Sequence, residues 1–336
     1  MMKSLICFCN RKNCDLLEKE IILFIKRGKK MKKAYGSLSV CILMWAFIPV
    51  ISKWILRDMN QYQMLYYSTL VSFIVMGIIL LWERKTHLIK QTSIKKYIQL
   101  SGLGLMGCML YYVFLYGALK LTTASEGFIL AYTWPMQVLI LSFMFREEKP
   151  TFLKVIGVVM GFIGIVIINT KGNFGHIEFT SMTGNMLAVA GAFIFALYSV
   201  LAKRVKVDRT FAVFIYFMVA SVGMTIWVSL RGELRPPEGV NWIWIVINGS
   251  VINGVSYLFW FYSLQHGKTH IITNVLYLTP FVSLIYIAFF LKEPIHVSAV
   301  LGLLAIVGGL LLHPIVTFVN SKSIPKTTPL EAPDIH

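Results

Sequence analysis

The side chains best suited to chemistry in this 336-residue sequence are uncharged: aromatic rings and amides that recur inside long apolar segments. A buried amide needs hydrogen-bonding partners. Gln137, Asn253 and Asn274 could therefore orient a bound molecule, although bonding between helices explains them equally well. A single aromatic residue in a membrane protein more often packs against other helices or lies at the membrane interface than contacts a ligand. The set as a whole predicts a mostly apolar cavity with a few orienting dipoles. The candidate binding residues are Trp45, Tyr112, Tyr132, Trp134, Gln137, Asn253, Tyr257, Trp260, Asn274 and Tyr277.

No combination of residues predicts an enzyme. The apolar segments hold no Ser/His/Asp, Cys/His or metal-binding constellation. Cys7, Cys9 and Cys14 have no neighbouring His to complete a zinc site. Five cysteines in total do not suggest a disulfide framework. We therefore predict no catalytic residue, no metal and no cofactor.

The elements that must position these side chains are membrane-spanning helices. The sequence is 57% apolar and 14% charged, which leaves more apolar surface than a soluble chain could bury. Segments of roughly 20 apolar residues can cross a ~30 Å hydrocarbon core as helices, because helices satisfy their own backbone hydrogen bonds in lipid. Ten such segments are predicted at about residues 35–56, 63–82, 98–119, 126–145, 152–170, 183–202, 211–230, 242–265, 271–291 and 297–318.

The lysine and arginine residues indicate how these helices are oriented. With a cytoplasmic amino terminus, all but seven of the 32 Lys and Arg residues lie on the cytoplasmic side, which predicts that both termini are inside. The net charge of +17 is then a topology signal and not a nucleic-acid footprint. The predicted partners are a small-molecule substrate and the lipid bilayer, with no nucleic acid, for a monomer or weak homo-oligomer. The seven exceptions are Lys53, Arg57, Lys120, Lys171, Arg231, Arg235 and Lys292.

The sequence also contains an internal duplication. Each copy holds five predicted spans, an odd number, so the second copy must enter the bilayer from the opposite side. Inverted repeats of this kind are typical of transporters that work by alternating access around a midplane site. A shift of 145 residues aligns Tyr112 with Tyr257, Pro135 with Pro280, Glu148 with Glu293, Gly157 with Gly302 and Gly164 with Gly309.

The distribution of charge limits the cargo of such a transporter. An ionisable residue in the middle of a span would by itself suggest a functional site, but none falls there. Organic phosphates would require paired cations, and a proton-driven cation exporter would require a buried carboxylate. We expect a small amphipathic or zwitterionic cargo with much apolar or aromatic surface. The ionisable residues of the spans lie near span ends: Lys53, Glu126, Lys203, His266, His270 and His313.

Pro135 and Pro280 lie near the middles of the fourth and ninth predicted spans. Each proline removes a backbone hydrogen bond and is expected to leave a carbonyl free four residues earlier, at Ala131 and Leu276. We interpret both prolines as hinges; a ligand site or a simple bend are the alternatives.

Other repeated residues have structural interpretations. The repeated glycines of the fifth and tenth spans are expected to pack these two helices. Glu148 and Glu293 are expected to cap the N-terminus of the next helix, where negative charge is favourable.

Several motifs resemble a known family. The stretch Gly191 to Lys203, Trp45-Ala46 with Lys53, and the run from Trp134-Pro135 to Gly164 with its copy at 280–309 are similar to the drug/metabolite transporter (DMT) superfamily of the EamA type. The resemblance covers about residues 32–318. Three motifs are most similar to the aromatic amino-acid exporter branch. That branch implies ten helices, two inside termini, and a central cavity built from the first, third, fourth, sixth, eighth and ninth helices. The three motifs are Tyr132 to Pro135, His266-Gly267 and Thr279-Pro280.

We therefore predict an all-α membrane protein with ten transmembrane helices, arranged as two inverted five-helix repeats around a central cavity. The repeats are residues 32–170 and 171–318, flanked by a cytoplasmic extension at 1–31 and a cytoplasmic tail at 319–336. The predicted function is export of amino acids, aromatic ones among them, or related hydrophobic metabolites through the cell membrane. The alternatives are a multidrug or quaternary-ammonium exporter, and a non-transporting membrane sensor. An open central cavity would favour transport; a cavity filled by large side chains would favour the sensor.

Overall fold

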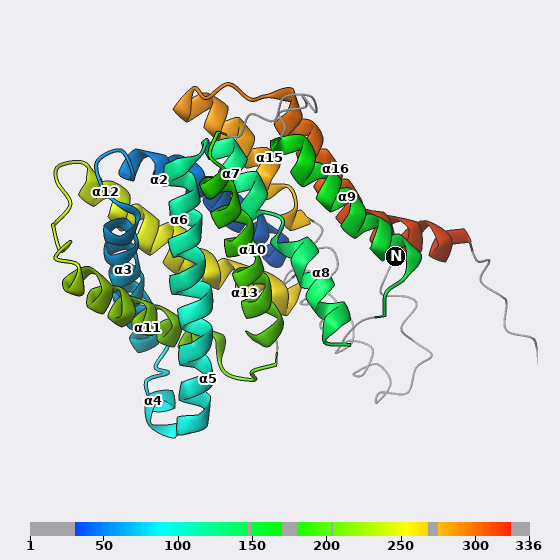
Figure 1. Cartoon of the computed structure of the whole chain (residues 1–336). Coiled ribbons are helices and arrows are strands. Elements are labelled where there is room, and N and C mark those ends of the chain that lie inside the picture. The colour runs from blue at the N-terminus through cyan, green and yellow to red at the C-terminus, as the bar shows by residue number, and fades with distance from the viewer. Residues whose placement is uncertain (1–30, 147–148, 170–179, 203, 268–274, 324–336) are drawn as a thin grey trace, which may run out of the picture.

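The protein is helical throughout the part of the chain that its computed structural model describes, residues 31–146, 149–169, 180–202, 204–267 and 275–323 (Figure 1). Seven helices are long and apolar enough to cross a membrane. Three shorter apolar helices, Phe152–Ile168, Thr279–Leu291 and Val297–Leu312, coincide with the predicted fifth, ninth and tenth spans. The predicted extension at 1–31 lies almost wholly outside the described residues, as does most of the tail at 319–336.

The first half of the chain begins with the apolar helix Met31–Ile55, which is interrupted by a turn at Phe47. Its second part is α2 (Ile48–Ile55), with Pro49 in the first turn, where a missing N–H costs nothing. The elements that follow are α3 (Gln61–Trp82), α4 (His87–Gln91), α5 (Ile94–Gly104), the π-helical segment η1 (Leu105–Leu110), α6 (Tyr111–Leu121), α7 (Ala124–Ala131), α8 (Trp134–Met144) and α9 (Phe152–Asn169).

The second half repeats much of this order. Like the continuous run of α5, η1 and α6, the run of α12, η2 and α13 contains a π-helical segment. The elements are α10 (Met182–Ala202), α11 (Arg209–Leu230), α12 (Asn241–Val246), η2 (Ile247–Val255), α13 (Ser256–His266), α15 (Thr279–Tyr286), the π-helical η3 (Ile287–Leu291) and α16 (Val297–Ser323).

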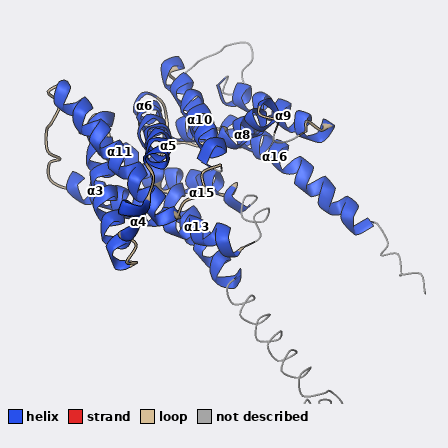
Figure 2. Ribbon diagram, turned by 90° about the horizontal axis from the view of Figure 1, so that it is seen from below, coloured by secondary structure: helices blue, strands red, loops and turns tan. Residues whose placement is uncertain are grey.

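Helices α3 and α11 pack side by side, and their ends have matching local structure (Figure 2). Asn60 begins α3 and accepts from the Gln63 N–H at 2.8 Å, while Asp208 begins α11 and accepts from the Phe211 N–H at 3.1 Å. After each helix, a residue with positive φ ends the last turn: Arg84 at 55° and Gly232 at 63°.

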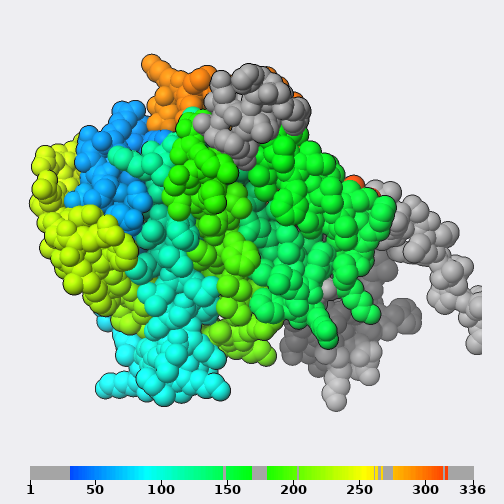
Figure 3. Space-filling view, in the orientation of Figure 1, coloured from blue at the N-terminus to red at the C-terminus, as the bar shows by residue number. Residues whose placement is uncertain are grey.

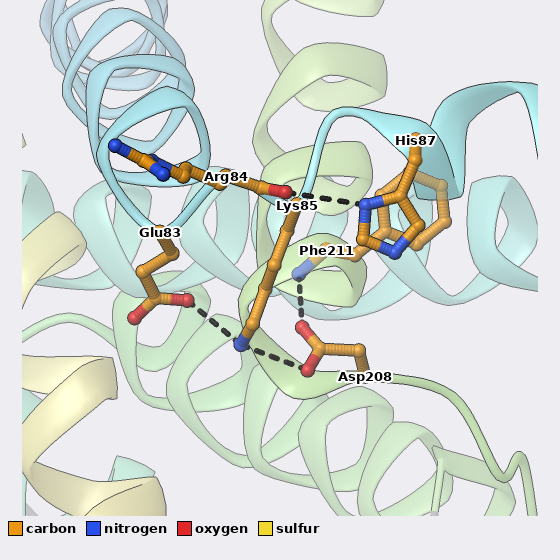
Figure 4. Close-up of polar contacts among 6 residues, drawn as sticks. All are labelled: Glu83, Arg84, Lys85, His87, Asp208 and Phe211. Atoms are coloured by element: carbon orange, nitrogen blue, oxygen red, sulfur yellow. Dashed lines mark hydrogen bonds and ion pairs between the residues drawn. The ribbon is translucent and has the colours of Figure 1, made fainter.

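Polar contacts join the two helices at both ends. Lys85, after α3, lies 2.7 Å from Glu83 and 2.9 Å from Asp208 (Figure 4). Partial burial opposes the charged form of Lys85, but the hydrogen bonds to these carboxylates raise its pKa above the usual value. At the other end, Asn60 Nδ2 donates to Glu233 Oε2 at 3.1 Å. The contact between Lys85 and Asp208 places the basic segments 84–96 and 204–209 at the same end of the bundle. This agrees with the prediction that both segments lie on one side of the membrane.

Close helix crossings depend on glycine in both halves. A Cβ on Gly104 would lie 2.7 Å from the Tyr216 Cα in α11, and one on Gly249 would lie 2.6 Å from the Ser68 carbonyl oxygen in α3. Gly104 directly precedes the π-helical segment η1, and Gly249 lies within the π-helical segment η2.

Helices α9 and α16 form a separate pair on the opposite side of the molecule from α3 and α11 (Figures 1 and 2). Gly157 meets Gly309, and Gly164 meets Gly302, so that the backbones touch without intervening side chains. The four glycines thus pack these two helices, as their spacing predicts.

Candidate functional site

The largest buried apolar cluster of the bundle contains tyrosines from several helices. Tyr112 and Tyr116 of α6 and Tyr132 after α7 are at most 9% exposed. The Tyr112 ring centroid lies 4.9 Å from that of Tyr111 and 5.4 Å from that of Tyr116. These separations are typical of aromatic pairs. We call this cluster, with Trp45, Tyr257 and Trp260, the aromatic centre.

The first helix joins the aromatic centre through Trp45. The Trp45 indole N–H donates to the Ser256 hydroxyl at 2.8 Å, and its ring centroid lies 5.9 Å from Tyr257 and 5.6 Å from Trp260. The Tyr112 and Tyr257 hydroxyls lie near enough to each other to interact. Four of the ten predicted binding residues, Trp45, Tyr112, Tyr257 and Trp260, therefore meet between the first helix, α6 and α13.

Two asparagines of η2 border this centre. Asn248 Nδ2 donates to the Ser68 hydroxyl at 3.0 Å and to the Tyr116 hydroxyl at 3.1 Å, so this amide bonds helix to helix. Asn253 is 1% exposed, and neither of its side-chain polar atoms completes a hydrogen bond within the described chain, although the Tyr116 hydroxyl lies near enough to interact. A buried amide without full hydrogen bonding costs free energy. Asn253 is thus the better candidate of the two for contacting a ligand.

Gln137 faces a different space. Its Nε2 donates to the Thr133 hydroxyl at 3.1 Å and to the Val189 carbonyl at 3.2 Å. With residues of α10 it lines a cavity of about 620 Å³. Helix α10 packs beside α6 on the face seen in Figures 1 and 3. The other lining residues are Met182, Asn185, Met186, Val189, Ala190, Phe193 and Ile194.

The remaining predicted residues lie at the edge of the aromatic centre or away from it. Trp134 packs edge-on against Phe195 at 5.2 Å and belongs with Trp45 and Trp260 to a small cluster around Leu38. Tyr277 is half-buried and packs instead with the apolar cluster under α9 and α16. Asn274 lies outside the described residues.

The two prolines mark helix breaks and not bends within a helix. Helix α7 ends at Ala131, a turn follows, and Pro135 is the second residue of α8; Pro280 is likewise the second residue of α15. A proline there lacks an N–H that the helix does not use.

The expectation of a free Leu276 carbonyl is wrong, because the Thr279 hydroxyl donates to it at 2.7 Å. The Thr133 hydroxyl does the same for Leu130, also at 2.7 Å. The threonine therefore replaces the missing backbone donor at the second break, while at the first break Thr133 bonds the carbonyl of Leu130 and not that of Ala131.

Glu293 also differs from the expectation. It does not cap the helix that follows it, α16, but the N-terminus of α7 in the other half of the chain. Its carboxylate accepts from the Ala124 N–H at 2.9 Å, the Ser125 N–H at 3.1 Å and the Ser125 hydroxyl at 2.5 Å. Sequence spacing suggested a local cap, and only the fold brings this carboxylate to a helix 168 residues away. Glu148 is outside the described residues.

Sequence reasoning also missed a polar pocket of about 500 Å³ near Glu293. Lys53 Nζ donates to the Thr122 carbonyl at 2.5 Å, and Lys120 Nζ donates to the Leu56 carbonyl. The sequence analysis gave Lys53 as a residue near a span end and both lysines as exceptions to the cytoplasmic charge bias. Their common location depends on how α2 and α6 pack. We call this the terminal pocket; its lining residues are Lys53, Leu56, Arg57, Leu119, Lys120, Leu291 and Glu293.

The aromatic centre is closed in this structure. Tyr112, Tyr116 and Tyr257 fill it with their own rings and are at most 5% exposed. The open cavity that the sequence led us to expect at these residues is therefore not seen here. By the criterion stated above, a centre filled by large side chains counts toward the sensor alternative. A transporter between its two open forms has a closed centre as well.

Comparison with known proteins identifies the family. A model of the EamA-like transporter family matches residues 32–170 and 182–313. An uncharacterized transporter of Archaeoglobus fulgidus is 26% identical over 284 residues, 82% of this chain and 96% of that protein. The aromatic amino acid exporter YddG of Ancylobacter novellus is 27% identical over 183 residues, 54% of this chain and 63% of the exporter.

A crystal structure that covers 88% of this chain and 100% of its own has a TM-score of 0.65 at 19% sequence identity, which supports the fold. The family model matches well over half of the sequence in two consecutive blocks. The chain is therefore a multi-pass membrane transporter that belongs to the EamA-like transporter family of the DMT superfamily.

Proposed function

We propose that this transporter exports amino acids, aromatic ones among them, or related small hydrophobic metabolites across the cytoplasmic membrane. The observation that carries the proposal is the aromatic centre, where Trp45, Tyr112 and Tyr257 meet beside the buried amide of Asn253. Such a surface suits a small molecule with an aromatic body and a few polar groups. The similarity to proteins named as aromatic amino acid exporters agrees with this cargo.

The fold we infer has ten transmembrane helices in two inverted repeats, 32–170 and 171–318, with both termini cytoplasmic. Paired details support it. Asn60, which begins α3, and Asp208, which begins α11, are 148 residues apart. Their contact partners are separated by the same 148 residues: Lys85 contacts Asp208 at one end of the bundle, and Glu233 contacts Asn60 at the other. The Gly104 crossing with α11 likewise corresponds to the Gly249 crossing with α3.

Alternating access then explains why a transporter can have a closed centre. In this mechanism the two repeats rock about a midplane site, which opens to each side in turn and is occluded between. The helix breaks at Pro135 and Pro280 would absorb part of this motion, with residues on either side acting as the hinge. Tyr132, in the first break, belongs to the aromatic centre, so a change in the break would reach the binding residues directly.

Uptake and counterflow in proteoliposomes of the full-length chain would test the proposal. A panel of labelled amino acids and cationic drugs should show counterflow of one or more amino acids above protein-free liposomes. Transport of cationic drugs alone would replace the proposal by the multidrug alternative, in which the aromatic faces bind a quaternary ammonium. Binding of a compound without any counterflow would favour the sensor.

A further inference from the structure

The terminal pocket concentrates positive charge at one end of the bundle. It lies where α2, α6 and η3 end, and three of its lining residues are cations: Lys53, Arg57 and Lys120. Its volume of about 500 Å³ is within the range of small-molecule sites. None of these three side chains belongs to the aromatic centre.

The two lysines are held in place by each other's helices. Lys53 of α2 bonds the Thr122 carbonyl after α6, and Lys120 of α6 bonds the Leu56 carbonyl after α2. An ammonium group has three donors, so each lysine keeps donors for a further acceptor. In the described chain, no carboxylate forms a salt bridge with either lysine.

The single carboxylate of the pocket is already engaged. Glu293 accepts from two N–H groups at the N-terminus of α7 and from the Ser125 hydroxyl. The positive end of that helix compensates its charge. Glu293 also attracts Lys53, but the pocket holds the three cations Lys53, Arg57 and Lys120 against this one carboxylate, and the excess of positive charge favours an anion.

An aromatic surface adjoins the pocket. Leu291 lines the pocket and also packs with Phe47, Trp54 and Tyr286 around Ile287. Trp54 directly follows Lys53 and lies 4.7 Å from Trp244 between ring centroids. A ligand with one anionic group and an apolar body could contact the lysines and this surface together.

We propose that the terminal pocket binds the carboxylate of an aromatic or otherwise apolar monocarboxylate, and that the cargo occupies it with its acid group as it enters or leaves at this end. The assignment of the transported cargo as the molecule bound in this pocket rests on the proposed function. The anion site itself rests on the two fixed lysines and the engaged glutamate. The phosphate of an anionic lipid headgroup shares this chemistry and is separated from the cargo by the experiment.

Binding of phenylacetate and of its neutral analogue phenylacetamide should be measured on the full-length chain in nanodiscs of zwitterionic lipid. Wild type should bind phenylacetate more tightly. Lys53→Gln and Lys120→Gln keep a hydrogen-bond donor but remove the charge, and each should weaken phenylacetate binding about tenfold, the effect of losing one charge-assisted hydrogen bond. Phenylacetamide binding should not change.

Lys292→Gln is the matched control, because Lys292 is an exposed cation next to Glu293 that does not line the pocket. It should bind phenylacetate as wild type does, and Lys53→Arg and Lys120→Arg should retain binding if charge is what matters. Thermal stability of each variant shows whether it is folded. Equal binding of phenylacetate and phenylacetamide by wild type, or wild-type phenylacetate binding by both Gln variants, would overturn the proposal.

Two further measurements distinguish a lipid headgroup from the transported cargo as the anion that occupies the terminal pocket. If phosphatidylglycerol in the nanodisc abolishes phenylacetate binding by wild type, the site belongs to a lipid headgroup and the cargo assignment is wrong. If both Gln variants lose phenylacetate binding but transport amino acids at wild-type rate and affinity, the pocket is not on the cargo route. Absence of amino-acid counterflow by wild type would instead contradict the proposed function, while the binding data still decide the anion site.

Discussion

Tyr112 and Tyr257 align with each other when the sequence is shifted by 145 residues, and their side chains lie near each other in the aromatic centre. This places one residue from each half of the chain on the same small surface. Trp45 and Ser256 make a similar link through a 2.8 Å hydrogen bond. At the scale of residues, the proposed site takes side chains from both halves of the chain, so we expect a change in either half to alter the binding of a cargo.

Replacing Tyr112 or Tyr257 with Phe removes a hydroxyl and keeps the ring. We expect the apparent KM of amino-acid transport to rise about 5- to 10-fold with little change in maximal rate, because one hydrogen bond is worth about 1 kcal/mol. Initial-rate transport in proteoliposomes measures both constants. Tyr97→Phe is the control, since the Tyr97 hydroxyl bonds the Ile89 carbonyl outside the aromatic centre. An unchanged KM in both variants would remove these hydroxyls from the site.

Glu293→Gln tests the cap between the two halves. The amide cannot replace the charge that faces the N-terminus of α7, so the variant should lose about 0.5–2 kcal/mol of stability. Thermal unfolding in detergent should show a lower Tm. Glu238→Gln is the comparison, because Glu238 is exposed in the loop before α12 and should leave the Tm unchanged. Equal Tm values for the two variants would show that the cap contributes nothing.

At the scale of elements, glycine decides how closely the helices approach. Gly104 and Gly249 stand where two backbones cross; Gly104 directly precedes η1 and Gly249 lies within η2. No side chain fits at either crossing without a shift of the neighbouring helix. These crossings fix the positions of α6 and α13, which carry Tyr112 and Tyr257.

Gly104→Ala and Gly249→Ala should each destabilise the protein by about 1–3 kcal/mol, the cost of overpacking a close contact. Gly102→Ala is a matched control on the same helix, because a Cβ there meets nothing within 4 Å. It should be neutral or slightly stabilising, since Ala favours helix over Gly. Thermal unfolding compares the three. Similar Tm values for Gly102→Ala and Gly104→Ala would mean that the crossing tolerates a side chain.

Pro135→Ala and Pro280→Ala test the hinges. Either change supplies an N–H that could join the helix before the break to the helix after it. Stability should hold or rise while transport falls, because a conformational step is lost and the fold is kept. Pro236→Ala, in an exposed loop, should leave both quantities unchanged. If both hinge variants transport at the wild-type rate, the breaks are packing features only.

At the scale of the whole molecule, a cluster of basic residues lies at each end of the bundle. One end carries the basic segments joined by Lys85 and Asp208, and the other carries the terminal pocket. The predicted topology assigns the first end to the cytoplasm. This assignment determines on which side a cargo would meet the terminal pocket.

Single cysteines introduced at Lys95, Lys206, Arg235 and Lys292 would test this topology in a chain whose Cys7, Cys9 and Cys14 are replaced by Ser. The four positions are exposed, and the native Cys41 and Cys108 are buried. A membrane-impermeant thiol reagent added outside intact cells should label positions 235 and 292. Positions 95 and 206 should label only after the membrane is opened. Labelling of 95 and 206 from opposite sides would contradict the inferred inverted repeats.

The sequence alone determined the membrane class, most of the helical segments and the family, because these depend on composition and on local or repeated patterns. It identified the glycines of α9 and α16 as packing residues, but not that these two helices pack on each other. It located both interruptions from their prolines, although it predicted a bend within a helix where the structure has a break. Contacts between distant segments were decided by the tertiary structure: the separation of Gln137 from Tyr257, the cap that Glu293 gives α7, and the crossed lysines of the terminal pocket. Apolar helices offer many faces of similar hydrophobicity, so helix pattern alone does not say which face meets which neighbour. Which faces meet is determined by the close packing of all the helices in the bundle.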